Sequence, residues 1–168
     1  RQAVIGSSAR ILAVGRDVTD RKNFEEQLEH QAHHDALTGL PNRRMLEKHL
    51  DQMIDKTEKE KIMLAVVYID LDGFKQVNDW LGHNVGDDIL RQVAMKMSNH
   101  VGRKDLVARM GGDEFVVILT DFGDMAGLEV LLQHLKKACY CSLEMNERTV
   151  IVTASMGVSI FPGDGQST

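Results

Sequence analysis

The sequence lacks the long apolar run that a membrane-spanning helix requires. No stretch of its 168 residues approaches the roughly 20 consecutive apolar residues of a transmembrane helix. The first residues also lack the order of a signal peptide, in which a charged segment precedes an apolar one. We therefore expect this chain to be cytoplasmic and to make no membrane contact itself, although the parent protein could carry a membrane anchor upstream.

The sequence has no excess of positive charge and little cysteine. The formal net charge is -5, and nothing obvious would neutralise a phosphate backbone, which disfavours nucleic-acid binding but leaves room for a small anionic ligand at one local site. Cys139 and Cys141 are one residue apart, which is poor spacing for a disulfide, and no further Cys or His completes a zinc-binding pattern. We expect both cysteines to be reduced and to serve packing.

The chain does contain enough apolar material for one main domain. With 43% apolar residues, 168 residues can bury one substantial core, with a fragment of a second module attached. Residues 10–19 are typical of a short terminal strand without a nearby partner, which suggests the severed end of an upstream domain. Residues 20–33 begin at a plausible N-cap, Asp20, and predict an amphipathic helix that could either pair with its own copy or pack on its own domain.

Strand and helix patterns alternate through the rest of the chain. Residues 62–71 are a nearly continuous β-rich apolar run, which predicts a central strand covered on both faces. Periodicity predicts helices around residues 45–54, 86–97 and 128–138, a hairpin with arms 106–110 and 115–119, and a half-covered strand over 152–160. This order favours an α+β sheet of four or five strands with helices packed on its faces.

Two pairs of carboxylates lie at the ends of apolar strands. Asp70 and Asp72 end the 62–71 strand, where the sheet would hold them rigidly and leave them open to a hard cation such as Mg²⁺. Asp113 and Glu114 lie at the hairpin tip. If the hairpin lies beside the 62–71 strand, Asp70 and Asp113 converge, and bound metal ions would relieve their repulsion, as in phosphoryl and nucleotidyl transfer. Alternatively, these acids are ordinary solvated turn residues.

The segment after Asp70 contains residues that suit a nucleoside triphosphate. Gly73 lets backbone N–H groups approach phosphate oxygens, and Lys75 supplies a positive charge. Asn78 and Asp87 could meet the edge of a guanine base, whose N1–H and N2–H₂ donors a carboxylate accepts together. The alternative is that these polar residues only cap or terminate a short helix.

Three ordered motifs together resemble one known family. The stretches "RMGGDEF", "YIDLDGFKQVNDWLGHNVGDDIL" and "DALTGLPNRR" look like the GGDEF domain of diguanylate cyclases, over roughly residues 33–163. The resemblance implies an α+β fold with a mostly antiparallel five-stranded sheet flanked by helices, similar to the palm of class III nucleotidyl cyclases. It also implies that two GTP molecules are condensed into cyclic di-GMP with release of pyrophosphate, with Mg²⁺ or Mn²⁺ as the cofactor.

The resemblance also assigns the acids. The family's metal ligands match Asp70, the backbone carbonyl of Leu71, and Asp113. Glu114 matches the acid that assists deprotonation of the attacking ribose 3′-OH, and we count it among the metal ligands as well. The resemblance therefore implies that Asp70, Asp113 and Glu114 are the catalytic residues.

The same resemblance assigns the substrate contacts. The family's phosphate contacts match the backbone of Gly73 and Phe74 and the side chain of Lys75. Guanine recognition falls on Asn78 and Asp87.

A supporting role and a domain order are implied too. Asp35, Asn42 and Arg43 match a "D-x-L-T-x-L-x-N-R" element that supports the site. Residues 1–19 would be the C-terminal remnant of a PAS-like sensor domain, residues 20–33 a signalling and dimerisation helix, and residues 34–168 a GGDEF domain that lacks its C-terminal end, including a Lys and an Arg that contact the triphosphate. One domain holds one GTP, so catalysis implies a homodimer.

One position departs from the family pattern. Many such enzymes carry an inhibitory product site, Arg-x-x-Asp, before the glycine pair. Here Asp105 is present, but Gly102 occupies the arginine position and Arg103 is one residue out of register. Losing the planar bidentate donor should weaken product binding, so we expect feedback inhibition to be weak or absent.

Three functions are compatible with these motifs. The first is a Mg²⁺-dependent diguanylate cyclase, and the second is a catalytically silent GTP-binding module that controls an attached cyclic di-GMP phosphodiesterase domain. The third, a pure dimerisation relay, leaves the acids unexplained. Glu114 favours the cyclase, because a pure binding site does not need an acid placed to activate a 3′-OH.

Overall fold

The structure, a computed structural model, describes residues 31–60, 62–120, 122–145 and 148–164. The strand expected over residues 10–19 lies outside this range, and so does most of the helix expected over 20–33, of which residues 31–33 are described and helical. Within the described residues, no helix is both long and apolar enough to cross a membrane.

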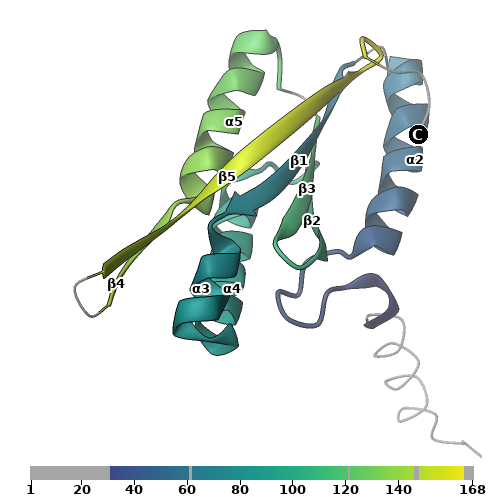
Figure 1. Ribbon diagram of the computed structural model, residues 1–168. Coiled ribbons are helices and arrows are strands. Elements are labelled where there is room, and N and C mark those ends of the chain that lie inside the picture. Colours follow the sequence, from purple (N-terminus) through teal and green to yellow (C-terminus); the bar gives the residue numbers. More distant parts are fainter. Residues whose placement is uncertain (1–30, 61, 121, 146–147, 165–168) are drawn as a thin grey trace, which may run out of the picture.

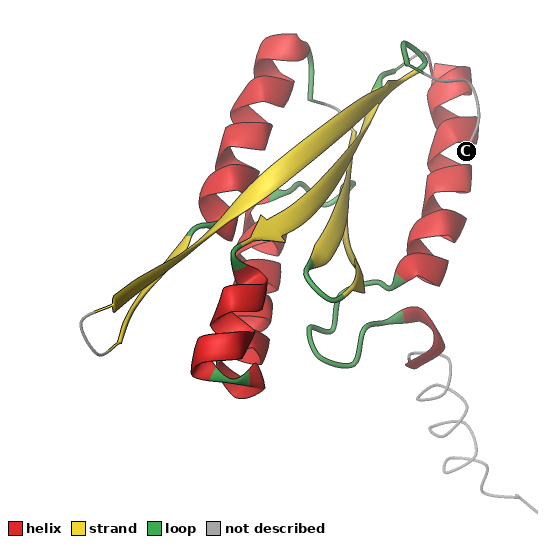
Figure 2. Ribbon diagram, in the orientation of Figure 1, coloured by secondary structure: helices red, strands yellow, loops and turns green. Residues whose placement is uncertain are grey.

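The described elements form one antiparallel sheet with helices on its faces (Figures 1 and 2). In chain order they are α2 (Arg43–Glu60), β1 (Leu64–Asp72), α3 (Phe74–Leu81), α4 (His83–His100), β2 (Leu106–Gly111), β3 (Glu114–Thr120), α5 (Met125–Cys139), β4 (Cys141–Met145) and β5 (Arg148–Phe161). The five strands lie in the order β2-β3-β1-β5-β4, and every neighbouring pair is antiparallel. The predicted α+β class and the five-stranded sheet are confirmed.

The central strand β1 is covered on both faces only in its first half, so the prediction of full coverage is wrong. On one face, alternate residues from Ala65 to Leu71 are buried in the larger core, which α3, α4 and α5 share with the sheet. On the other face, α2 buries Leu64 at the start of the strand. Further along that face Tyr68, Asp70 and Asp72 are exposed. The α2 core involves only one end of this face, so the other end stays open.

Helix α4 shows how periodic apolar residues select the buried face. Ile89, Leu90, Val93 and Met97 recur at helical spacing and are all buried, as predicted. The helix begins at His83, before the predicted start at residue 86.

Two elements were not predicted as separate units. Helix α3 is divided from α4 by Gly82 alone, whose φ of 85° suits glycine and ends the first helix. Strand β4 pairs with the start of β5, from Arg148 opposite Met145 to Val152 opposite Cys141. This hairpin projects from the body of the domain at the lower left of Figure 1, and it extends β5 beyond the predicted 152–160.

The two cysteines are free, as predicted. Cys139 is buried at the end of α5, with its Sγ 3.9 Å from the Sδ of Met97 on α4. Burial raises the pKa of the Cys139 thiol to about 12, so it stays protonated and packs as a small apolar group.

Candidate functional site

The acids at the end of β1 and at the hairpin tip lie side by side. The register between β1 and β3 sets Asp70 directly opposite Glu114. Beyond this pair, the Leu71 N–H donates a hydrogen bond to the Asp113 carbonyl at 3.3 Å. The hairpin therefore lies beside the predicted 62–71 strand, and the residues expected to hold metal and to act in catalysis share one corner of the sheet.

Two glycines shape the hairpin tip. Strand β2 ends at Gly111 and β3 begins at Glu114, so Gly112 and Asp113 form the turn. The φ angles of Gly111 and Gly112 are 135° and 54°, which disfavour residues with a Cβ. A Cβ at either position would meet no atom within 4 Å, so the turn requires glycine for its backbone conformation and not for space.

Negative charge accumulates at this corner. Burial raises the pKa of Asp70, and the charges of Asp113, Asp72 and Glu114 raise it further. Every charge that contributes to this pKa shift is negative. The corner therefore favours the approach of a cation.

The expected ligands are all oxygen donors, which suits a hard divalent cation. They are the carboxylates of Asp70, Asp113 and Glu114 and the carbonyl of Leu71. The described residues contain no group of three or more Asp, Glu, His or Cys side chains gathered closely enough to hold a metal ion. Since Mg²⁺ usually keeps waters and takes substrate phosphates as ligands, this partial set fits a metal shared with a bound triphosphate.

Tyr68 belongs to the same corner, although we did not single it out from the sequence. It lies two residues before Asp70 on the open face and is 43% exposed. Its hydroxyl hydrogen-bonds to the Glu114 carboxylate, which raises the pKa of Tyr68, as do burial and the charge of Glu114. Strand alternation was the available signal, because residues 68, 70 and 72 of one strand share a face.

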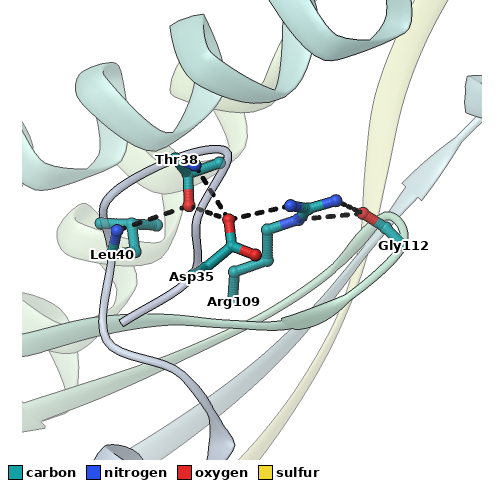
Figure 3. Close-up of polar contacts among 5 residues, drawn as sticks. All are labelled: Asp35, Thr38, Leu40, Arg109 and Gly112. Atoms are coloured by element: carbon teal, nitrogen blue, oxygen red, sulfur yellow. Dashed lines mark hydrogen bonds and ion pairs between the residues drawn. The ribbon is translucent and has the colours of Figure 1, made fainter. Parts of the chain in front are cut away.

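Arg109 joins the hairpin tip to the segment before α2 (Figure 3). Its Nε and one terminal nitrogen donate to the Gly112 carbonyl at 3.1 and 2.7 Å, and the other terminal nitrogen donates to Asp35 at 2.8 Å. The same Asp35 oxygen accepts hydrogen bonds from the N–H and the hydroxyl of Thr38, at 2.9 and 2.6 Å. The Arg109 and Asp35 side chains are only 10% and 22% exposed. A largely buried ion pair thus holds the turn that carries Asp113.

Asp35 was expected to support the site, whereas the role of Arg109 was missed. Burial raises the pKa of Asp35, but hydrogen bonds from Thr38 and Arg109 and the Arg109 charge outweigh burial and lower it below the ordinary value of 3.8. Arg109 lies within "RMGGDEF", but nothing in that stretch indicates a partner 74 residues away.

The other two supporting residues have different surroundings. Asn42 joins residues 31–33 to α2: its amide nitrogen donates to the Ala32 carbonyl at 3.0 Å, and its side-chain oxygen accepts from the Met45 N–H at 3.1 Å. The second bond is an N-cap for α2. Arg43 is exposed at the start of α2, and its charge lowers the pKa of Tyr68, against the larger upward effects.

The segment from Gly73 to Lys75 turns from β1 into α3. Gly73 has a φ of 81°, and a Cβ there would lie 2.9 Å from the Ile151 carbonyl oxygen, so glycine is required for both conformation and space. Phe74 and Lys75 begin α3, where N–H groups have no acceptor within the helix. The Phe74 side chain is buried and the Lys75 side chain is exposed. This arrangement suits an anion at the end of β1.

Asn78 and Asp87 lie on the neighbouring helices α3 and α4. A Cβ at Gly86 would lie 2.1 Å from the Asn78 side-chain oxygen, so the Asn78 carboxamide occupies the space that a side chain at Gly86 would need. Asn78 therefore lies against Gly86, the residue before Asp87, and both Asn78 and Asp87 are partly exposed. The two residues expected to recognise a base thus lie on helices that pack together.

Comparisons with known proteins give consistent matches. The family model described as "Diguanylate cyclase, GGDEF domain" matches residues 32–168. The bifunctional diguanylate cyclase/cyclic di-GMP phosphodiesterase MucR of Pseudomonas aeruginosa is 40% identical over 134 residues, which are 80% of this chain and 19% of that protein. The diguanylate cyclase TpbB of the same species is 36% identical over 136 residues, 80% of this chain and 31% of that protein. The chain thus spans less than a third of either relative.

A solved structure has the same fold. The crystal structure of a sensory box/GGDEF family protein from Caulobacter crescentus matches with a TM-score of 0.72 and 37% identity, over 80% of this chain and 87% of that one.

We expect Asp35→Ala to destabilise the domain by about 2 to 3 kcal/mol, because it leaves the mostly buried Arg109 guanidinium without its carboxylate partner. Urea unfolding followed by circular dichroism measures the loss. Asp55→Ala, which removes an exposed acid from α2, should cost less than about 0.5 kcal/mol and serves as the control. Equal effects of the two variants would contradict the role given to the ion pair.

Wild type and Asp35→Ala also test how the stability contributed by Asp35 depends on pH. Because the pKa of Asp35 is lowered in the folded state, its stabilisation is fully present above the ordinary value of 3.8 and is lost as the pH falls through the lowered value. The stability difference between wild type and Asp35→Ala should therefore stay constant from about pH 7 to about pH 5 and shrink only in stronger acid. If the stability difference shrinks as the pH rises instead, the assignment of a lowered pKa to Asp35 is contradicted.

Proposed function

Because the chain belongs to the GGDEF domain family, we propose that it is a diguanylate cyclase, which condenses two GTP molecules into cyclic di-GMP and pyrophosphate. The observation that carries the proposal is the β1–β3 register, which sets Asp70 opposite Glu114 and brings Asp113 next to Leu71. The match to the diguanylate cyclase TpbB supports it.

In this proposal GTP binds along the segment from β1 to α4. The backbone N–H groups of Gly73 and Phe74 and the Lys75 ammonium group bind the phosphates. Asp87 accepts hydrogen bonds from the guanine N1–H and N2–H₂ groups, and Asn78 beside it adds a carboxamide contact. Adenine lacks that pair of donors, so these contacts favour guanine.

The acids at the corner act on the bound nucleotide. Asp70, the Leu71 carbonyl and Asp113, with Glu114 as a further ligand, would hold Mg²⁺ or Mn²⁺, which neutralises triphosphate charge and eases departure of pyrophosphate. The Glu114 carboxylate accepts the proton of the ribose 3′-OH, whose oxygen attacks the α-phosphorus of the second GTP as the bond to pyrophosphate breaks. The Tyr68 hydroxyl on Glu114 restrains that carboxylate.

The reaction then requires two domains face to face. One domain holds one GTP, on the face of the sheet that α2 leaves open, so a homodimer supplies the second. An upstream sensor domain would act through residues 20–33. In support, the Asn42 N–H donates to the His33 carbonyl at 2.9 Å, which joins the described end of that helix to the start of α2.

A second candidate is a GTP-binding regulatory module without turnover, which controls an attached cyclic di-GMP phosphodiesterase domain. The match to MucR, whose name includes cyclic di-GMP phosphodiesterase besides diguanylate cyclase, supports the attached phosphodiesterase domain but not the loss of turnover. The two candidates differ in the need for Glu114, because guanine and phosphate binding alone do not use a general base.

Glu114→Gln should lower cyclic di-GMP formation by about a hundredfold or more while GTP binding persists, because it removes the proton acceptor but keeps the shape. Asp70→Asn should also abolish product. Chromatography of reactions with GTP and Mg²⁺ measures both, with the exposed α2 variant Glu47→Gln as the control. A wild-type protein that binds GTP and dimerises without making product would favour the regulatory module.

Gly86→Ala should weaken GTP binding by about five- to tenfold, because the new methyl group displaces the Asn78 carboxamide and costs a base contact. The new Cβ would also lie 3.2 Å from the Cζ of the buried Phe74 ring, which must shift by a few tenths of an ångström. The fold should persist, since alanine suits a helix and the Asn78 side chain can rotate away. Isothermal titration calorimetry with GTP measures the affinity, and thermal unfolding checks the fold. Unchanged affinity in this variant and in Asn78→Ala would exclude Asn78 from guanine recognition.

In the segment that corresponds to the family's inhibitory site, the Asp105 carboxylate is hydrogen-bonded within the protein. One Asp105 oxygen accepts the Gly102 N–H at 2.7 Å, and the other accepts the N–H and the hydroxyl of Thr120 at 2.8 and 3.3 Å. Asp105 thus fastens the start of β2 to the end of β3. Together with the absence of an arginine at Gly102, this supports weak or absent feedback inhibition.

Micromolar cyclic di-GMP should therefore leave the initial rate unchanged. The rate is measured against added product in wild type and in Arg103→Ala, which removes the neighbouring guanidinium. Inhibition of wild type that disappears in Arg103→Ala would show that Arg103 replaces the missing arginine and would contradict this prediction.

A further inference from the structure

The two acids at the end of β1 have different hydrogen-bond partners. Asp70 and Asp72 lie on the same exposed face of one strand. Asp72 accepts the Thr153 hydroxyl on one carboxylate oxygen at 3.2 Å and the Ser155 hydroxyl on the other at 2.9 Å. Within the described part of the chain, no group donates a hydrogen bond to the Asp70 carboxylate. The fold therefore leaves Asp70 open to a ligand and fixes Asp72 itself.

The strand register shows that Ser155 bonds to Asp72 although Asp70 is its direct neighbour on β1. In the β1–β5 pairing Thr153 lies opposite Asp72, but Ser155 lies opposite Asp70. The Ser155 hydroxyl nevertheless reaches diagonally to Asp72. The hydroxyls of Thr153 and Ser155 thus converge on one carboxylate, and we call the three residues Asp72, Thr153 and Ser155 the Asp72 clip.

The clip is adjacent to the segment proposed to bind phosphate. Gly73 follows Asp72 directly, and its backbone passes so close to Ile151 of β5 that no Cβ would fit. The next side chain, Phe74, is buried in the core on the other side of the sheet. The turn is therefore fixed on one face by the clip and on the other by Phe74, with only the Gly73 backbone between them.

We propose that Asp72 is a positioning residue for triphosphate binding: its carboxylate, held by Thr153 and Ser155, sets where the N–H groups of Gly73 and Phe74 lie. This inference rests on the proposed GTP site and deepens it. Asp72 does not contact phosphate itself, because like charges repel. Its oxygens instead face the β5 hydroxyls.

The test removes the two hydroxyls and keeps the side-chain volumes. The double variant Thr153→Val/Ser155→Ala should bind GTP about five- to tenfold more weakly, with KM raised by the same factor and kcat within about twofold of wild type. Calorimetry with GTP and Mg²⁺ measures affinity, and thermal unfolding checks the fold. Thr153→Ser and Ser155→Thr keep the hydroxyls and should keep wild-type affinity.

A matched control separates the clip from a general effect on β5. Ser159→Ala removes a hydroxyl from the same strand and face, opposite Val66 and away from the turn, and should bind GTP as wild type does. Wild-type affinity in the double variant overturns the proposal. An equal loss in Ser159→Ala, or in the variants that keep the hydroxyls, also overturns it.

Asp72→Asn separates hydrogen bonding from charge. Asparagine keeps one acceptor oxygen, so affinity should fall, but by less than in the double variant. Tighter GTP binding by Asp72→Asn would mean that charge repulsion dominates and would overturn the positioning role. GTP binding can be measured without turnover. If wild type binds GTP but forms no product, only the cyclase proposal is contradicted. If wild type binds no GTP, both the cyclase proposal and the positioning role of Asp72 are contradicted.

Discussion

The Arg109 guanidinium joins two segments that lie 74 residues apart in the sequence, and the site at the hairpin depends on it. The turn between β2 and β3 consists of Gly112 and Asp113 at the end of the sheet, where pairing between strands stops. Arg109 fixes this turn by donating twice to Gly112, and Asp35 fixes Arg109 in turn. A lysine could not replace it, because one ammonium group lacks the planar fork that serves both partners at once.

The corner that Arg109 supports violates a local rule of sheet stability. Asp70 and Glu114 face each other directly across β1 and β3, and like charges in that position cost up to about 1 kcal/mol. The strands tolerate this because their remaining residues are largely buried and apolar, and Tyr68 gives Glu114 a neutral donor. Local rules are broken most often where function requires it, and here the broken rule leaves negative charge where two inner strands of the sheet end.

The sequence predicted features that depend on one element at a time. The periodic apolar residues of α4 indicated its buried face, and the glycines between two apolar runs indicated the hairpin. Coverage of β1 was predicted wrongly, because an apolar run cannot show that α2 reaches only one end of the strand. Arg109 and Asp72 were missed as supports for a related reason. Their partners are 74 and 81 residues away. Arg109 meets Asp35 because the segment before α2 packs on β2, and Asp72 meets Thr153 because β1 pairs with β5.

The incomplete coverage by α2 has a kinetic consequence. A substrate enclosed in a cleft reacts at a rate proportional to the enzyme concentration. A substrate held on an open sheet face can react only after that face meets a second copy of the protein. For the proposed reaction between two such faces, output at low occupancy of the dimer rises with the square of the protein concentration. A tether between two copies replaces that encounter with an effective local concentration, so control can act on distance and leave every residue of the site unchanged.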